Sequence, residues 1–273
     1  MTEKTINIAE ENSNSYKKLS IQISLNGLSF CIADTILNKV VLSDTVFFKT
    51  ESTPYLVLKE LKSLFEKHSV LKKKFSDVLV IHKNNLFSLV PKTLFDENEL
   101  ANYLKFNTKI LANDNIVYDE VENQDVISVY VPFTNINNYI FENFGEFEFK
   151  HSSTAVLQTL LQQKASSKTI CYVHVSDREM ELAVLHQKKV LLYNQFPYRT
   201  KEDFLYYILF TFEQLQLDVE SVKLKLFGKI EEGDELFEIC YNYIKKVSVF
   251  LPKNNTYSFE EGSQDSIDLT MLN

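Results

Sequence analysis

Residues 169–196, "TICYVHVSDREMELAVLHQKKVLLYNQF", predict three β-strands in succession. Apolar residues fill the segments TICYVHV (169–175), EMELAVLH (179–186) and KKVLLYNQF (188–196), and short polar segments separate them. Strands that are joined by such short turns pair as antiparallel neighbours. The stretch therefore indicates a three-stranded antiparallel meander.

A helix and a further strand follow the meander. Thr200 and Asp203 have the spacing of a box-like cap at the start of a helix. Apolar residues then recur at the spacing of one helical face: Leu205, Ile208, Leu209 and Phe212. The next strand is the segment VKLKLFG (222–228). A meander, a crossover helix and another strand make a mixed sheet with helices packed on it.

The first half of the chain repeats this order of elements. "KLSIQISLNGLSFCIAD" (18–34) predicts two strands around a turn, and "NKVVLSDTVFF" (38–48) predicts a third. Thr53 as the cap and Pro54 at the first position mark the start of a helix. The segment DVLVIH (77–82) is the strand that follows it.

The two sets of elements recur at a nearly constant distance. The turns at Asn26 and Asp177 lie 151 residues apart, and the helix caps Thr53 and Thr200 lie 147 residues apart. This repeat predicts an α/β fold of two similar domains. The predicted limits are a flexible N-terminus at 1–17, a first domain at 18–152, a second domain with its lead-in helix at 153–252, and a polar tail at 253–273.

The tail is polar and acidic, so we expect it to be frayed. Its end nevertheless interleaves apolar residues with polar ones: Ile267, Leu269, Met271 and Leu272. A short linear motif that adds a strand to the sheet edge of a partner is the alternative interpretation.

Composition bounds the class of protein. With 273 residues, of which 45% are hydrophobic, the chain can bury a substantial core, and its formal net charge of −8 gives no basic surface for nucleic acid. The polar N-terminus lacks the pattern of a signal peptide, and no apolar run is long enough to span a membrane. Cys31, Cys171 and Cys240 lie far apart in apolar segments and suit buried free thiols. We therefore expect a cytoplasmic protein with a protein partner and no membrane or nucleic-acid contact.

Two meanders, each followed by a helix and a strand, resemble the actin-like ATPase superfamily, which includes actin, Hsp70 and sugar kinases. The size and order of the elements are similar, more narrowly, to a family of bacterial proteins of unknown function with this fold. The resemblance covers most of residues 18–252 and implies duplicated ribonuclease H-like domains. In active members of the superfamily the first hairpin of each domain binds phosphate and Mg²⁺ through an aspartate and a glycine-rich turn. A glycine after a late strand approaches the adenosine.

The first hairpin turn departs from that pattern. Ser24 stands about where the superfamily has its aspartate, and only Asn26 and Gly27 supply a flexible turn. An Asn-Gly pair is the usual sequence of a type I′ hairpin turn, so it needs no phosphate to explain it.

The second turn departs further. His174 stands about where an aspartate would be, and the turn places Asp177 and Glu179 where glycines would allow close backbone approach. Two carboxylates there would repel a triphosphate. Gly228, at the end of a late strand, is the remaining similarity. The sequence therefore predicts a degenerate nucleotide site with no catalytic residue, no metal and no cofactor.

The leading hypothesis is a non-catalytic interaction or scaffolding module. The alternative is a divergent ATP-binding phosphotransferase or ATPase, with Ser24, Asn26 and Gly228 at the nucleotide and Asp177 or Glu179 holding Mg²⁺. A third possibility is another small ligand in the interdomain cleft.

Two further sets of residues are candidates for function. His82 and His174 are the only histidines placed for acid–base work, and no recognised metal or nucleophile motif accompanies them. The aromatic residues just before Thr200 form a candidate partner surface if they are exposed: Tyr193, Phe196 and Tyr198.

Overall fold

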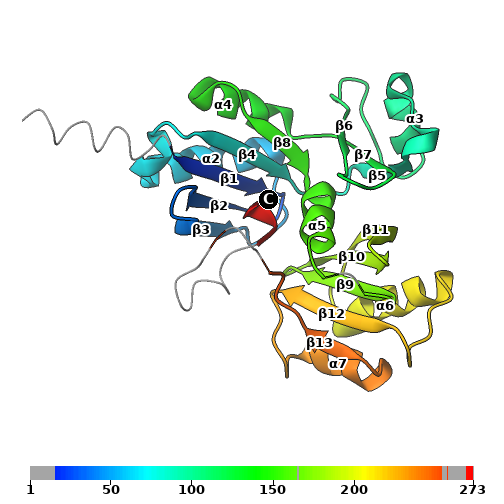
Figure 1. The fold of residues 1–273 in the computed structure, drawn as a ribbon. Helices are drawn as coiled ribbons and strands as arrows, with labels where there is room; N and C mark the ends of the chain where they lie inside the picture. Colours follow the sequence, from blue (N-terminus) through cyan, green and yellow to red (C-terminus); the bar gives the residue numbers. More distant parts are fainter. Residues whose placement is uncertain (1–15, 165, 254–256, 258–268, 273) are drawn as a thin grey trace, which may run out of the picture. The chain divides into compact units, whose positions relative to one another are not determined.

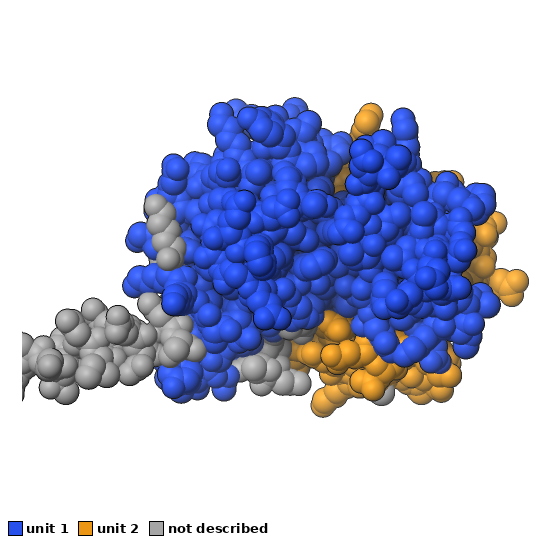
Figure 2. Space-filling model, turned by 90° about the horizontal axis from the view of Figure 1, so that it is seen from above, with its two compact units in different colours: residues 1–121, 125–156, 254–273 blue, residues 122–124, 157–253 orange. Residues whose placement is uncertain are grey.

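The computed structural model describes residues 16–164, 166–253, 257 and 269–272. The chain forms two compact units (Figure 2). Unit 1 contains residues 1–121, 125–156 and 254–273, and unit 2 contains residues 122–124 and 157–253. None of the helices in the described ranges is long and apolar enough to cross a membrane.

Unit 1 is built on a five-stranded mixed sheet (Figure 1). The first three strands form the predicted antiparallel meander, and the next two strands run parallel to the first. In spatial order the strands are β3 (Lys39–Phe47), β2 (Gly27–Asp34), β1 (Lys17–Ile23), β4 (Asp77–His82) and β8 (Glu148–His151).

Helices α2 (Pro54–Lys67) and α4 (Thr134–Phe144) pack against one face of this sheet. The Thr53 hydroxyl accepts a hydrogen bond from the Leu56 N–H at 3.4 Å and caps α2, as the sequence predicts. The buried face of α2 lies against alternate residues of the strands, because successive side chains of a strand point to opposite faces. The 3₁₀ turn η1 (Ser69–Lys72) then leads toward β4.

A smaller antiparallel sheet inserted between β4 and β8 completes unit 1. Its strands and short helices surround a separate apolar cluster that includes Leu104 and Val129. The elements are β5 (Phe87–Pro91), η2 (Lys92–Leu94), η3 (Glu97–Glu99), α3 (Leu100–Leu104), β6 (Val117–Glu120) and β7 (Val126–Tyr130).

Unit 2 repeats the five-stranded topology of unit 1. Here α6 (Lys201–Gln214) and α7 (Glu235–Tyr243) cover one face of the sheet. The helix α5 (Ser152–Leu161) contains the boundary between the two units. In spatial order the strands are β11 (Lys189–Pro197), β10 (Glu179–His186), β9 (Ile170–Val175), β12 (Lys223–Gly228) and β13 (Val247–Val249).

The two meanders also share an irregularity. The register shifts between Ile32 and Ala33 where β2 pairs with β3, and between Val184 and Leu185 where β10 pairs with β11. A bulge bends and twists a strand, so a bulge at the same place gives both sheets the same local shape. The duplication predicted from the sequence is thus present in the backbone.

Asp119, at the end of β6, anchors the smaller sheet to β8 and the start of α5. One carboxylate oxygen accepts from the Tyr130 hydroxyl at 2.9 Å. The other accepts from the His151 N–H at 2.7 Å and from the Thr154 hydroxyl at 2.9 Å. Burial raises the pKa of Asp119 to about 6, although these hydrogen bonds act in the opposite direction.

This raised pKa makes the stability of unit 1 depend on pH through Asp119. The folded chain keeps the proton up to about pH 6, whereas the unfolded chain loses it near pH 4. The Asp119 contribution to the free energy of unfolding should therefore fall by about 2 kcal/mol as the pH rises from 4 to 6.5. In urea unfolding, the free energy of unfolding of Asp119→Asn relative to that of the wild type should rise by that amount over this pH range.

Asp125 is exposed, and Asp125→Asn is the matched control. Its free energy of unfolding should differ from that of the wild type by a constant amount over the same pH range. The comparison with wild type is needed because His82 has the opposite effect. Burial lowers the pKa of His82 to about 3, so its contribution to stability is lost as the pH falls below about 6.5. A constant difference between Asp119→Asn and wild type would contradict the assignment.

Candidate functional site

The candidate site lies at the carboxyl ends of the parallel strands of unit 2. In open α/β sheets this edge is the usual place for ligands, because the loops that follow the strands meet there. The loops after β9, β11 and β12 line an open pocket of about 520 Å³. Its lining residues are Ser176, Asp177, Tyr198, Arg199, Thr200, Lys201, Glu202, Lys229, Asp234, Glu235 and Leu236.

The turn after β9 is held by its own hydrogen bonds. The Ser176 N–H donates to the Glu179 carbonyl at 3.0 Å, and the Tyr198 N–H donates to the Arg178 carbonyl at 3.0 Å. The Tyr198 hydroxyl donates to the Ser176 carbonyl. At the end of β12, the Lys229 N–H donates to the Val175 carbonyl at 2.9 Å. These amides face protein acceptors and are not available to a phosphate.

Asp177, a predicted site residue, lies in the pocket and is paired with Lys229. Both side chains are largely exposed, so the pair adds little stability, but it occupies the carboxylate that would hold a metal. Across the described part of the chain, no three His, Cys, Asp or Glu residues are grouped so that they could hold a metal ion.

The pocket carries no excess of positive charge. Its lining has three basic side chains, Arg199, Lys201 and Lys229. It has four acidic side chains, Asp177, Glu202, Asp234 and Glu235. A triphosphate needs a positive surplus or a bound cation, since each phosphate is negatively charged.

The N-terminus of α6 is also occupied by the chain itself. The Thr200 hydroxyl accepts from the Asp203 N–H at 3.1 Å. The Asp203 carboxylate accepts from the N–H groups of Thr200 and Arg199 at 3.2 and 3.1 Å. This is the capping box predicted from the sequence, and it uses the Asp203 N–H, one of the donors that an anion would otherwise bind at a helix start.

Gly228 is the last residue of β12, at a position where a side chain would not fit. Its φ of +89° is a backbone conformation that other residues rarely adopt. An added Cβ would lie 2.6 Å from His174 Cδ2 and 2.6 Å from the Val175 carbonyl oxygen. The His174 ring in turn stacks on Phe227 with ring centroids 4.8 Å apart. Packing therefore accounts for this glycine without a nucleotide base.

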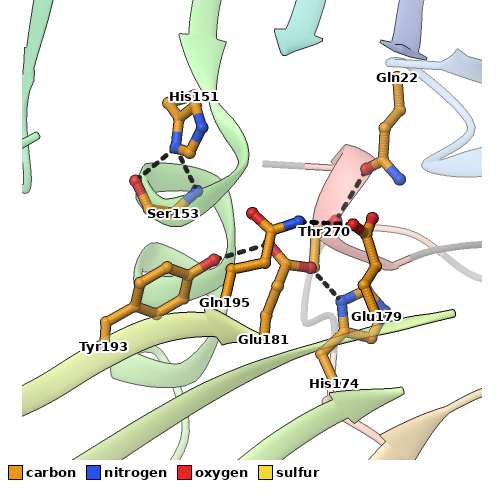
Figure 3. Close-up of polar contacts among 9 residues, drawn as sticks. All are labelled: Gln22, His151, Ser153, His174, Glu179, Glu181, Tyr193, Gln195 and Thr270. Carbon is orange, nitrogen blue, oxygen red and sulfur yellow. Dashed lines mark hydrogen bonds and ion pairs between the residues drawn. The ribbon is translucent and has the colours of Figure 1, made fainter. Parts of the chain in front are cut away.

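His174 belongs to a buried polar cluster that the sequence analysis missed (Figure 3). Its Nδ1 lies 2.9 Å from Glu181 Oε2, and the Tyr193 hydroxyl donates to Glu181 Oε1 at 2.6 Å. All three residues are buried. The available signal was a glutamate inside the apolar strand EMELAVLH, where an acid needs partners once it is buried.

The remaining predicted residues of unit 2 lie in β10, in β11 and directly after β11. Glu179 accepts from the Gln195 side chain at 2.8 Å (Figure 3). Tyr193 is only 7% exposed and bonds Glu181, so it offers no partner surface. Phe196 is partly buried and stacks on Tyr207 at 4.6 Å between ring centroids. A partner surface at Phe196 and Tyr198 stays a prediction.

In unit 1 the first hairpin turn is not the expected type I′ turn, because neither Asn26 nor Gly27 has a positive φ. Hydrogen bonds among its own residues hold it. The Ser24 N–H and hydroxyl both donate to the Gly27 carbonyl, at 2.9 and 3.0 Å, and the Asn26 N–H donates to the Ser24 hydroxyl at 3.1 Å. A Cβ at Gly27 would lie 2.6 Å from the Val46 carbonyl oxygen, so close strand packing explains this glycine. A nucleotide site that combines this turn with Asp177, Glu179 and Gly228 stays a prediction.

His82, the other histidine considered for acid–base work, is buried in unit 1. Its Nδ1 accepts from the Phe133 N–H at 3.2 Å, and its Nε2 lies 2.9 Å from Asn137 Oδ1. The ring is therefore neutral, with the proton on Nε2, in agreement with its lowered pKa of about 3. It joins β4 to the start of α4 as a structural residue.

The sequence pattern of a family described as "Protein of unknown function (DUF3822)" matches residues 6–247. The chain belongs to this family. No curated protein matches its sequence.

Two solved structures are similar over nearly the whole chain. One is a Bacteroides thetaiotaomicron protein with actin-like ATPase fold and unknown function. It is 21% identical, with a TM-score of 0.80, over 90% of this chain and 95% of that one. The other is a PilM-PilN type IV pilus biogenesis complex, 13% identical, with a TM-score of 0.59, over 90% and 93% of the two chains. The chain therefore has the actin-like ATPase fold predicted from the repeat.

The packing around Gly228 predicts a large effect of substitution. Gly228→Ala should lower the free energy of unfolding of unit 2 by about 2–4 kcal/mol, because strained backbone and overlap with Val175 and His174 combine. Gly233→Ala is the matched control: its φ is +97°, but no atom lies within 4 Å of the added Cβ. It should lose only about 1 kcal/mol for the backbone conformation.

Thiol labelling of Cys171 and Cys240 during urea unfolding measures unit 2 directly, because both lie in its core. Equal losses of free energy of unfolding in Gly228→Ala and Gly233→Ala would contradict the packing explanation. The hypothesis that Gly228 contacts a ligand would then be open again.

Proposed function

We propose that this member of the family is a non-catalytic, protein-binding module on an actin-like fold. One observation carries the proposal: backbone N–H groups at both hairpin turns and directly after β12 already have protein acceptors. Among them are Ser24 and Asn26 in unit 1, and Ser176 and Lys229 in unit 2. A nucleotide that used these donors would have to break their present hydrogen bonds, which costs free energy for each donor.

Charge supports the same conclusion. The pocket in unit 2 has more acidic than basic side chains, and Lys229, which follows Gly228, is paired with Asp177. The whole chain has a formal net charge of −8. A polyphosphate or a nucleic acid would therefore meet repulsion both at long range and in the pocket.

The similarity to the PilM-PilN complex supports a protein partner. In that complex a chain with the same fold is found together with another protein. By analogy of fold, we propose that this chain also uses its surface for a partner protein. Its three buried free cysteines agree with a place in a reducing compartment, and we propose the cytoplasm.

The enzyme alternative keeps one supporting observation, the open pocket of about 520 Å³ at the carboxyl edge of the parallel strands. Under that alternative Asp177 would leave Lys229 and hold Mg²⁺. The two proposals differ in what nucleotide does to stability.

Thermal unfolding with ATP, ADP or AMP, with and without Mg²⁺, separates them. A ligand that binds only the folded chain must raise the melting temperature by mass action. We expect no rise at millimolar nucleotide. A rise with Mg-ATP that is lost in Asp177→Ala and kept in Glu238→Ala would overturn the proposal. Glu238 is an exposed acid of α7 outside the pocket, so the control removes the same charge from unit 2.

A further inference from the structure

Residues 269–272 pack on unit 1 instead of forming part of a frayed tail. They form a short 3₁₀ helix, η5 (Leu269–Leu272), drawn in red in Figure 1. Thr270, Met271 and Leu272 are 2%, 2% and 5% exposed. The rest of the expected tail lies outside the described residues, except for Lys253 and Tyr257.

The segment covers the face of the sheet opposite α2 and α4. Along β2, Leu28, Phe30 and Ile32 belong to the helix-covered core. Their neighbours Cys31 and Ala33 belong to the cluster that contains Met271 and Leu272. Alternation along the strand places these two sets on opposite faces.

The surface under η5 combines small side chains with larger apolar ones. Small side chains line it, namely Ser29, Cys31, Ala33 and Ala155. Larger apolar side chains flank it, namely Val40, Leu79 and Ile81. Small residues beside large ones leave room for a long unbranched side chain, and methionine adapts to such a space. We call this surface the 269–272 cradle.

Two long polar contacts orient the segment. The Thr270 hydroxyl lies 3.4 Å from Gln22 Oε1 (Figure 3), and the Ser29 hydroxyl lies 3.4 Å from Met271 Sδ. Both distances are at the limit for hydrogen bonds, and the burial of Met271 and Leu272 adds apolar attraction. The strand pairs of the sheet are complete without the segment. The segment therefore contacts the sheet through its side chains without being one of its strands, and in this respect it resembles a bound peptide.

We propose that the 269–272 cradle is a peptide-binding site for a partner protein, and that residues 269–272 occupy it as an internal ligand. The internal ligand defines the chemistry of the partner: a residue with a hydroxyl group, followed by two large flexible apolar residues. An emptied cradle would expose a contiguous apolar surface, the kind that binds proteins. This inference deepens the proposed function by naming the surface, and it rests on that proposal for the existence of a partner.

A chain shortened to end at Asp268 tests the site with a peptide. The fluorescent peptide SIDLTMLN, residues 266–273, should bind the shortened chain at micromolar concentrations, as followed by fluorescence anisotropy. It should bind the full chain at least about 30-fold more weakly, because the tethered segment competes at high effective concentration. The peptide with Met271→Leu should bind within about threefold of the original, and the peptide with Met271→Asp should not bind.

Cys31 provides a second readout. In the full chain it is 1% exposed, and burial raises the pKa of its thiol to about 12, so it should resist an aromatic disulfide reagent. In the shortened chain it should react, and the peptide should protect it again. Cys31→Ser identifies the thiol. If Cys171 and Cys240 also react, the shortened chain is unfolded, and the full chain with Met271→Asp takes its place.

Three results would overturn the proposal. Failure of the peptide to bind a folded shortened chain, or to protect Cys31, would make the segment an ordinary part of the core. Loss of binding with Met271→Leu would exclude a class of partner peptides. Dimerisation of the full chain that the truncation abolishes would assign the cradle to a second copy. Nucleotide binding, by contrast, would overturn the proposed function and leave the peptide result standing.

Discussion

In the turn between β9 and β10 the Ser176 amide donates to the Glu179 carbonyl, and beside it the Lys229 amide donates to the Val175 carbonyl. The turn between β1 and β2 is closed in the same way through Ser24 and Gly27. A backbone donor that already has a partner cannot bind a phosphate without losing that partner. This constraint is the basis of our proposal that the protein keeps the fold without the phosphate chemistry that the superfamily resemblance implies.

Side-chain packing behind the second turn also leaves little space at this end of the sheet. His174 occupies the space under Gly228 and bonds Glu181, which also accepts from Tyr193. A buried glutamate must have its partners, so this cluster joins three neighbouring strands, β9, β10 and β11. The contacts of His174, Glu181 and Tyr193 therefore have a structural explanation. In unit 1, residues 269–272 cover the face of the sheet opposite α2 and α4. We assign the binding of a partner to this surface, the 269–272 cradle.

Much of the fold could be predicted from the sequence because its signals are local. The Thr200 and Asp203 capping box, the Thr53 cap with Pro54, and the three strands of each meander all appear as expected. The sequence could not show contacts between distant residues. Lys229 pairs with Asp177 across 52 positions, and Met271 reaches Ser29 across 242. Glu181 was missed because strand periodicity says which face a residue occupies and not which partner it finds.

Amide hydrogen exchange at Ser24, Asn26, Ser176 and Lys229, measured without ligand and with Mg-ATP, shows whether these turns are closed to phosphate. These N–H groups have protein acceptors, so the account predicts slow exchange in the free protein and no change at millimolar Mg-ATP. Fast exchange in the free protein that slows when Mg-ATP is added would show that the turns are open to phosphate and would contradict the account.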